Sequence, residues 1–224
     1  MTPAVRYASS TTLDAELDAL TQTTIGLDAS RRFMADGFVR LEGLWGSGLA
    51  DALEAEARST QAAAIRPERA PGPDSVASRN RAPARQVTVD DAPVLAALHG
   101  ALARVARLLT GRLVVPSVGN YGYYELDDAC YLHVDVDAAD VTLLTTVAGQ
   151  IGPLHLHPEL VGRGPDELHV LEADPAWNRQ SGHLLSYPRH GVAAIRGRVW
   201  PHHRPGAPVT GLNTVASLQY GERF

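Results

Sequence analysis

The sequence predicts a mainly β protein, a double-stranded β-helix of the jelly-roll type supported by N-terminal helices. Short runs rich in β-branched and aromatic residues recur between residues 112 and 220, separated by Gly, Pro and Asp, as is typical of antiparallel strands. Apolar residues at helical spacing dominate residues 1–111. No fixed repeat or linker divides the 224 residues, so we expect a single domain over 1–224.

Helices are expected to support the sheet from the first half of the chain. Apolar spacing predicts them over residues 13–23, 28–37, 49–65 and 91–110, with Gly111 as the C-terminal stop of the last. Residues 38–41 alternate like a first strand. Residues 66–88 are rich in Pro, Ser, Ala and Arg and have almost no large apolar side chain, which predicts a mobile loop.

The second half, residues 112–224, is expected to form the β-helix core. Its runs have the length of strands and are bounded by turn residues, which favours a sandwich or barrel over alternating βαβ units. In chain order the runs are RLVVPS, NYGYYEL, ACYLHVD, VTLLTTV, GPLHLHP, ELHVLE, GHLLSY, VAAIRG, RVWPHHR and NTVASLQY.

Composition excludes several classes of function. The net charge of −5 and the pI near 6.0 argue against a nucleic-acid partner, because tracking phosphates requires a basic surface. Every cationic side chain is an arginine, so lysine general bases and Schiff-base chemistry are absent. The single cysteine, the lack of a long apolar run and an N-terminus unlike a signal peptide predict a cytoplasmic protein without a membrane span. Periodicity leaves the oligomeric state open.

A His-x-Asp motif is the strongest chemical signal. On a strand through ACYLHVD, alternation places Tyr131, His133 and Asp135 on one face and leaves Cys130 on the other, as a small buried hydrophobe. An imidazole and a carboxylate two residues apart, with a distant second histidine, form the facial triad of non-haem iron sites. The late strand ahead of NTVASLQY offers that histidine in His202.

Other histidines compete for the same role. His203 adjoins His202, and because neighbouring strand residues face opposite ways, only one of the two can be a ligand; we favour His202. His190 lies in a turn, where a solvated side chain is expected. His155 and His157 share one face of a strand and suit either a second metal pair or, more simply, a polar wall or exposed strand face.

Together these features resemble the iron(II)/2-oxoglutarate dioxygenase superfamily, in its prolyl-hydroxylase-like and phytanoyl-CoA-hydroxylase-like branches. The resemblance is carried by residues 32–39, 121–135, 152–154 and 191–220, about half of the chain. It implies that His133, Asp135 and His202 bind Fe(II), and that O2 and 2-oxoglutarate are co-substrates. The carboxylate of Asp135 argues against a halogenase, because the resembling halogenases lack it.

One departure concerns the far carboxylate of 2-oxoglutarate. The family usually grips it with an arginine or lysine at the start of the last strand, where this chain has Asn213, and a neutral amide cannot form the bidentate ion pair that arginine makes. Candidate replacements are Arg204, which shares strand parity with His202, and Arg198 or Arg196 earlier in the run.

Tyrosines are further candidates for binding the co-substrate. Tyr121, Tyr123 and Tyr131 lie in the runs that lead to the motif, and a phenol on an apolar wall is a good hydrogen-bond donor to a carboxylate. Core packing is the simpler expectation for each. Of the three, Tyr121 and Tyr131 are the candidates that we retain for the co-substrate.

The sequence leaves three hypotheses for function. The first is an Fe(II) and 2-oxoglutarate-dependent oxygenase that hydroxylates a small molecule, with secondary metabolism as the setting that we consider. The second is a redox-neutral, cupin-type isomerase or lyase, or an iron oxygenase that does not use 2-oxoglutarate; Asn213 keeps it open. The third is a jelly roll that binds a ligand without iron. The substrate itself does not follow from the sequence.

Overall fold

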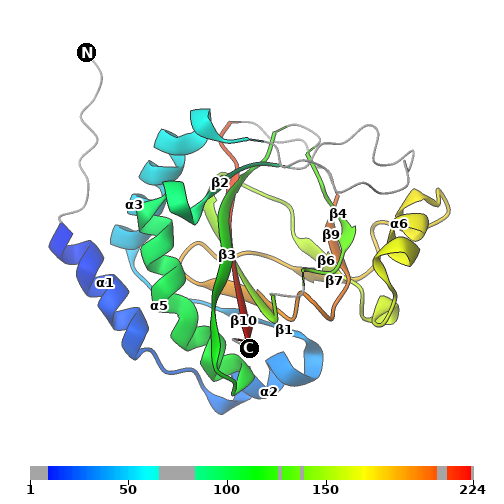
Figure 1. The fold of residues 1–224 in the computed structure, drawn as a ribbon, viewed down its shortest axis with the longest axis horizontal. Coiled ribbons are helices and arrows are strands. Elements are labelled where there is room, and N and C mark those ends of the chain that lie inside the picture. Colours follow the sequence, from blue (N-terminus) through cyan, green and yellow to red (C-terminus); the bar gives the residue numbers. More distant parts are fainter. Residues whose placement is uncertain (1–9, 66–83, 126–127, 137–138, 206–210, 223–224) are drawn as a thin grey trace.

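Two antiparallel sheets face each other across the interior of the protein (Figure 1). The computed structural model describes residues 10–65, 84–125, 128–136, 139–205 and 211–222. The six-stranded sheet has the order β1-β8-β5-β10-β3-β2, and the four-stranded sheet has the order β4-β9-β6-β7. The strands are β1 (Phe38–Leu41), β2 (Arg85–Thr88), β3 (Val114–Tyr123), β4 (Cys130–His133), β5 (Val141–Ala148), β6 (Leu154–Leu156), β7 (His183–Leu185), β8 (Val192–Ile195), β9 (His202–Arg204) and β10 (Thr214–Glu222).

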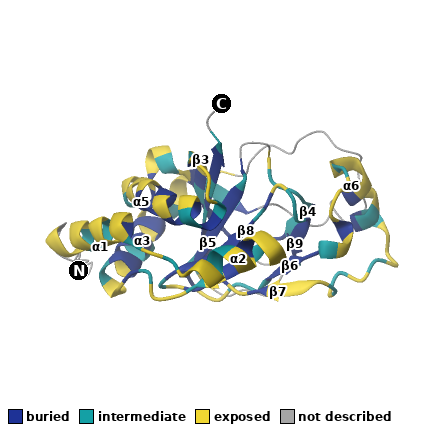
Figure 2. Cartoon of the chain, turned by 90° about the horizontal axis from the view of Figure 1, so that it is seen from below, coloured by how far each residue is buried: buried dark blue, intermediate teal, exposed yellow. Residues whose placement is uncertain are grey.

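Helices cover the outer face of the larger sheet, and one helix lies beside the smaller sheet (Figures 1 and 2). They are α1 (Ser10–Gln22), α2 (Leu27–Asp36), α3 (Ser47–Thr60), α5 (Pro93–Thr110) and α6 (Pro165–Ala173), with single 3-10 turns at η1 (Gln61–Ala63), η2 (Val89–Asp91) and η3 (Pro158–Leu160). The left-handed Gly37 and Gly111 end α2 and α5, as their positions in the sequence predict. In the described ranges, no helix has the length and apolar character needed to cross a membrane.

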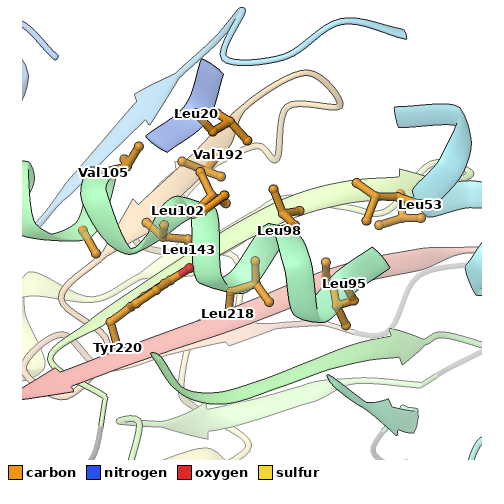
Figure 3. Close-up of a cluster of buried hydrophobic side chains, with 14 of the residues drawn as sticks. Leu20, Leu53, Leu95, Leu98, Leu102, Val105, Leu143, Val192, Leu218 and Tyr220 are labelled. Atoms are coloured by element: carbon orange, nitrogen blue, oxygen red, sulfur yellow. The ribbon is translucent and has the colours of Figure 1, made fainter. Parts of the chain in front are cut away.

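The main core fills the space between the larger sheet and the helices (Figure 3). The apolar stripe of α5 is buried there, and its Leu98 and Leu102 lie among Leu143 of β5 and Leu218 of β10, all four with no exposed surface. Burying one such leucine contributes roughly 1.5–3 kcal/mol. A smaller apolar cluster between the two sheets contains Leu144, Leu154, Leu156, Leu185, Tyr187, Ala193, Ile195 and Val215.

Three expectations for secondary structure need correction. The run ELHVLE is not a strand but most of helix α6: Pro165 occupies its first turn, and the Glu167 carboxylate accepts a hydrogen bond from the Gly164 N–H. The predicted loop over residues 66–88 ends in strand β2, whose Val87 is buried; residues 66–83 lie outside the described ranges. The runs RLVVPS and NYGYYEL, expected as two strands, join into the single strand β3.

The buried His99 of α5 makes the stability of the fold dependent on pH. Its Nε2 lies 2.9 Å from the carbonyl oxygen of Gln219, and burial lowers the pKa of His99 below its ordinary value. As the pH falls, His99 is therefore protonated at a higher pH in the unfolded chain than in the folded one. The folded state loses stability as the pH falls through about 6.5, the pKa of an unperturbed histidine. We expect His99→Gln to reduce this slope by up to about 1.4 kcal/mol per pH unit.

Urea unfolding between pH 5 and pH 8 measures this slope. Glutamine keeps a donor for the Gln219 carbonyl but has no titrating group, so the slope and not the absolute stability is the readout. His183→Gln on the exposed face of β7 is the matched control and should leave the profile unchanged. Equal slopes in the wild type and in His99→Gln would contradict the prediction.

Candidate metal centre

Neighbouring strands of the smaller sheet bring two histidines together. His133 at the end of β4 is the register partner of His202 at the start of β9, and their ring centroids are 4.4 Å apart. Asp135 follows two residues after β4, with its Oδ1 3.5 Å from His133 Nε2 and 3.6 Å from His202 Nε2. Among the residues that the structure describes, these three alone bring three donor atoms of metal-binding type within 4.8 Å of one another.

Main-chain carbonyl groups orient both imidazoles toward this point. Nδ1 of His133 lies 2.6 Å from the carbonyl oxygen of Tyr131, and Nδ1 of His202 lies 2.8 Å from that of Trp200. Because a carbonyl oxygen only accepts, each Nδ1 carries a proton, and Nε2 is the ring atom that faces Asp135 and can bind a metal once it is deprotonated. Metal-binding histidines are commonly held in this way.

Asp135 is held at its other oxygen and at its main chain. Oδ2 accepts a hydrogen bond from the Thr142 hydroxyl, and the Asp135 N–H donates to the Gly197 carbonyl at 2.9 Å. Burial alone would raise the pKa of the Asp135 carboxyl, but the imidazoles of His202 and His133 outweigh it and hold that pKa well below its ordinary value. The carboxylate is therefore ionised, and its Oδ1, which faces the two Nε2 atoms, is the oxygen that can bind a metal.

The close approach of Gly197 to Asp135 has a testable consequence. A Cβ atom at residue 197 would overlap the Oδ2 atom of Asp135 and would also press on the Thr142 hydroxyl. We expect Gly197→Ala to displace the carboxylate and to weaken Mn(II) affinity at least about tenfold, the effect of losing an outer-shell contact. Calorimetric titration with Mn(II) measures it, and Gly26→Ala, where a Cβ meets nothing within 4 Å, is the matched control. Equal affinity in the Gly197 variant and the control would contradict the prediction.

A cavity of about 170 Å³ opens between the two sheets at this site. His133, Asp135 and His202 line it together with Arg204 of β9. The His202 and Asp135 side chains are 5% and 7% exposed, whereas that of His133 is 38% exposed, so the centre is reached past His133.

Arg204 lies buried in the same cavity. Its guanidinium carbon is 3.6 Å from the ring centre of Tyr124, and its side chain is 3% exposed. Its Nη2 atom is buried and has no hydrogen-bond partner among the described residues. An arginine remains protonated when buried, so it presents a cation with an unused donor to whatever enters the cavity.

The other predicted co-substrate residues lie elsewhere. Arg198 is half exposed, with its Nη1 3.7 Å from the Asp140 carboxylate. The Tyr121 hydroxyl donates to Glu56 on the helical side of the larger sheet. Asn213 Oδ1 accepts from the Gln150 N–H, and its Nδ2 donates to the Gly211 carbonyl, which ties a turn together. Tyr131 offers its carbonyl to His133, and its side chain is not among the described residues that line the cavity.

Cys130 was expected to face away from the ligands, and this expectation is wrong. Three steps along β4, from Cys130 to His133, match only two steps along β9, from Arg204 to His202. This one-residue β-bulge reverses the alternation, so Cys130 and His133 share a face. The Cys130 Sγ lies 3.9 Å from His133 Nδ1 and lines the cavity.

Two tyrosines that we did not single out line the cavity instead. Tyr124 follows β3 with the parity of the inward-facing Gly122, and Tyr187 follows β7 with the parity of the buried Leu185. Strand parity, extended beyond the end of each run, is the signal that would have identified them.

The remaining histidines lie away from this cavity. His203 Nδ1 is 3.0 Å from His157 Nε2, and its other nitrogen is 3.0 Å from the Arg179 carbonyl; burial lowers the pKa of His203 to about 3. His155 Nδ1 is 3.0 Å from the Ser181 carbonyl. His190 Nδ1 lies 3.2 Å from the Gly46 carbonyl. His155, His157 and His203 form a buried polar cluster, so His155 and His157 lie neither on the wall of this cavity nor on an exposed strand face.

Comparisons with solved structures show what fold this is. No family model and no curated protein sequence matches the chain. The prolyl hydroxylase from Trichoplax adhaerens, solved with a peptide of hypoxia inducible factor, is 12% identical, with a TM-score of 0.61 over 96% of this chain and 94% of that one. The non-haem α-ketoglutarate-dependent carbocyclase SnoK of nogalamycin biosynthesis is 13% identical, with a TM-score of 0.67 over 89% and 85%.

HygX from Streptomyces hygroscopicus, with nickel and 2-oxoglutarate bound, is a third such structure. It is 14% identical, with a TM-score of 0.61 over 90% of this chain and 89% of that one. The matches span most of each chain, and the predicted double-stranded β-helix is thereby confirmed.

Proposed function

We propose that this protein is a non-haem Fe(II) oxygenase that oxidises a small molecule with O2 and 2-oxoglutarate, with hydroxylation as the outcome. One observation carries the proposal. A single cavity holds three metal-donor side chains, those of His133, Asp135 and His202, together with the buried Arg204, whose Nη2 has no hydrogen-bond partner within the described ranges. A metal and a dicarboxylate need these two features in one place.

The donor set fits ferrous iron. Two neutral imidazoles and one carboxylate on one side of a metal leave positions open for other ligands, the arrangement of non-haem iron oxygenases. His133 and His202 present Nε2 atoms whose tautomer is set by main-chain carbonyls, and Asp135 presents Oδ1. The exposed edge of His133 gives O2 and substrate an approach to the open side.

Arg204 fits the far carboxylate of 2-oxoglutarate. Its guanidinium packs against the Tyr124 ring, and Tyr187 lines the same cavity. A guanidinium can bind a carboxylate through two parallel hydrogen bonds. Arg204 thus takes the role that Asn213 cannot fill. When bound, iron and 2-oxoglutarate supply O2-dependent oxidation of a C–H bond, with succinate and CO2 as the products of the oxo acid.

The protein's own part is to position the reactants and to exclude water. Leu144, Leu154, Ile195 and Val215 form the apolar part of the wall, and Thr142 holds Asp135. The solved structures support this assignment, since HygX binds nickel and 2-oxoglutarate and SnoK is named for its dependence on α-ketoglutarate. A redox-neutral activity would give no role to the buried Nη2 of Arg204, which has no hydrogen-bond partner among the described residues.

Anaerobic titration of the metal-free protein tests the proposal. Adding Fe(II) and then 2-oxoglutarate should produce the weak visible charge-transfer band of a 2-oxo acid chelated to iron, and neither addition alone should do so. Admitting O2 should then release succinate from 2-oxoglutarate. Iron binding without a band would replace the proposal with a redox-neutral or 2-oxoglutarate-independent function, and a failure to bind iron would remove the metal centre itself.

A further inference from the structure

The charges around the proposed centre are balanced before any substrate arrives. Apart from the titratable side chains of His133, His202 and Cys130, the charged side chains among the described residues that line the cavity are those of Arg204 and Asp135. The two charges of Fe(II) and the charge of Arg204 together equal those of the Asp135 carboxylate and the 2-oxoglutarate dianion. A charged substrate group would therefore enter this part of the cavity without a partner, which is costly.

The rest of the described lining is neutral but rich in hydrogen-bonding groups. Gln86 of β2, Asn120 of β3, and Ser217 and Gln219 of β10 all line the cavity. Ser217 is the direct register partner of Asn120, and Gln219 is that of Thr142 on β5. These carboxamides and hydroxyls therefore form one polar stripe that crosses the inner face of the larger sheet and reaches the residue that holds Asp135.

Gln219 carries a second, independent sign of a ligand. Its Oε1 atom is buried and has no hydrogen-bond partner among the described residues. A buried carboxamide oxygen left in this state is unfavourable, so a donor is expected to meet it in the working complex. A hydroxyl can both donate and accept, and so satisfies a carboxamide in either orientation.

We infer that the substrate of this site is uncharged where it enters the cavity and presents hydroxyl groups there, as a polyol or a glycoside does. The inference rests on the proposed function, because the balance of charge counts the metal and the oxo acid. The volume of about 170 Å³ limits what can enter, since pockets that enclose a whole drug-sized ligand have about 300–1,000 Å³. A larger substrate can therefore enter by one end alone, such as one sugar ring.

Three ring-matched probes test the inference: methyl β-D-glucopyranoside, methyl β-D-glucuronide and methyl 6-amino-6-deoxy-β-D-glucopyranoside. They share one ring and differ in the group at C6, which is a neutral hydroxymethyl group, a carboxylate or an aminomethyl cation. The protein is loaded with Mn(II) and 2-oxoglutarate, and the paramagnetic relaxation of each probe's protons reports binding beside the metal even when that binding is weak. We expect the neutral ring to bind at least about tenfold more tightly than either charged ring.

Substitutions then assign the contact. Gln219→Leu is expected to weaken binding of the neutral ring about fivefold to tenfold, the effect of one lost hydrogen bond. Gln180→Leu makes the same change at an exposed position away from the cavity and should have no effect. Asn120→Asp adds a negative charge with almost no change of shape, so it should weaken binding of the glucuronide and strengthen binding of the amino ring; a gain of binding cannot come from a folding defect.

The outcomes separate the two proposals. If Mn(II) or 2-oxoglutarate fails to bind, the proposed function fails and this inference falls with it. If both bind, three results would each overturn the inference alone: a charged ring relaxed as strongly as the neutral one, no ring relaxed beyond a Mn(II)-free control, or equal binding by Gln219→Leu and Gln180→Leu.

Discussion

His202→Ala is expected to lower the affinity of the protein for Fe(II) by more than about 100-fold, beyond the effect of losing an outer-shell contact. His202 Nε2 is one of three donor atoms, and no described side chain of the cavity is placed to replace it, because the adjacent His203 lies within the separate polar cluster with His157. The remaining His133 and Asp135 would form a two-donor site, from which solvent readily removes a divalent ion.

Competition with a chromogenic chelator under anaerobic conditions measures this affinity. His183→Ala, on an exposed strand of the same sheet, is the matched control and should bind Fe(II) like the wild type. Thermal unfolding in the presence of excess metal gives an independent readout, since a bound ion stabilises the folded state by an amount set by its dissociation constant. Undiminished affinity in His202→Ala would show that the metal, if bound, lies elsewhere.

Arg204→Met is expected to weaken 2-oxoglutarate binding by about 30-fold to 1,000-fold or more, because removing one partner of a buried, hydrogen-bonded charge pair costs about 2–5 kcal/mol. Without the oxo acid, the same substitution should not destabilise the folded protein. The guanidinium is buried and has no carboxylate partner in the part of the chain that the structure describes, so an apolar side chain of similar length should be tolerated or should stabilise the fold.

Thermal unfolding with and without 2-oxoglutarate distinguishes this role from a structural one. Saturating 2-oxoglutarate should raise the Tm of the metal-loaded wild type but not that of Arg204→Met. Arg198→Met is the matched control: it removes a half-exposed arginine that faces Asp140, and it should keep the full ligand-induced shift. If the two variants respond alike, Arg204 does not bind the oxo acid.

The sequence predicted the fold well where long periodic patterns exist. The stripe of α5 and its glycine stop, the first helix pair and most strands of the β-helix follow from apolar spacing and turn residues. The run ELHVLE was ambiguous because six residues fit both the helical and the strand period. Tertiary packing of Leu168 against Leu132 favours the helix. The sequence did not predict strand β2, because β2 pairs with β3, which is distant in the sequence.

The metal donors were easier to predict than the carboxylate-binding residue. His133 and Asp135 are close in sequence, and the order of the strands indicated His202. Strand parity could not choose between Arg204 and Arg198, because residues 197–200 form a turn and β9 begins only at His202. The same limit applies to Cys130, whose orientation depends on a bulge that leaves no signature in the sequence.

The carbonyl groups of Tyr131 and Trp200 that orient the two imidazoles have a consequence for how this site tolerates mutation. Every amino acid supplies the same main-chain carbonyl oxygen, whatever its side chain is. The orientation of His133 and His202 is therefore set by the path of the main chain and not by neighbouring side chains. Substitutions at residues 131 and 200 that preserve the two strands should leave the metal donors in place. A centre built in this way allows the surrounding sequence to diverge, for example toward new substrates, while its coordination geometry is inherited unchanged.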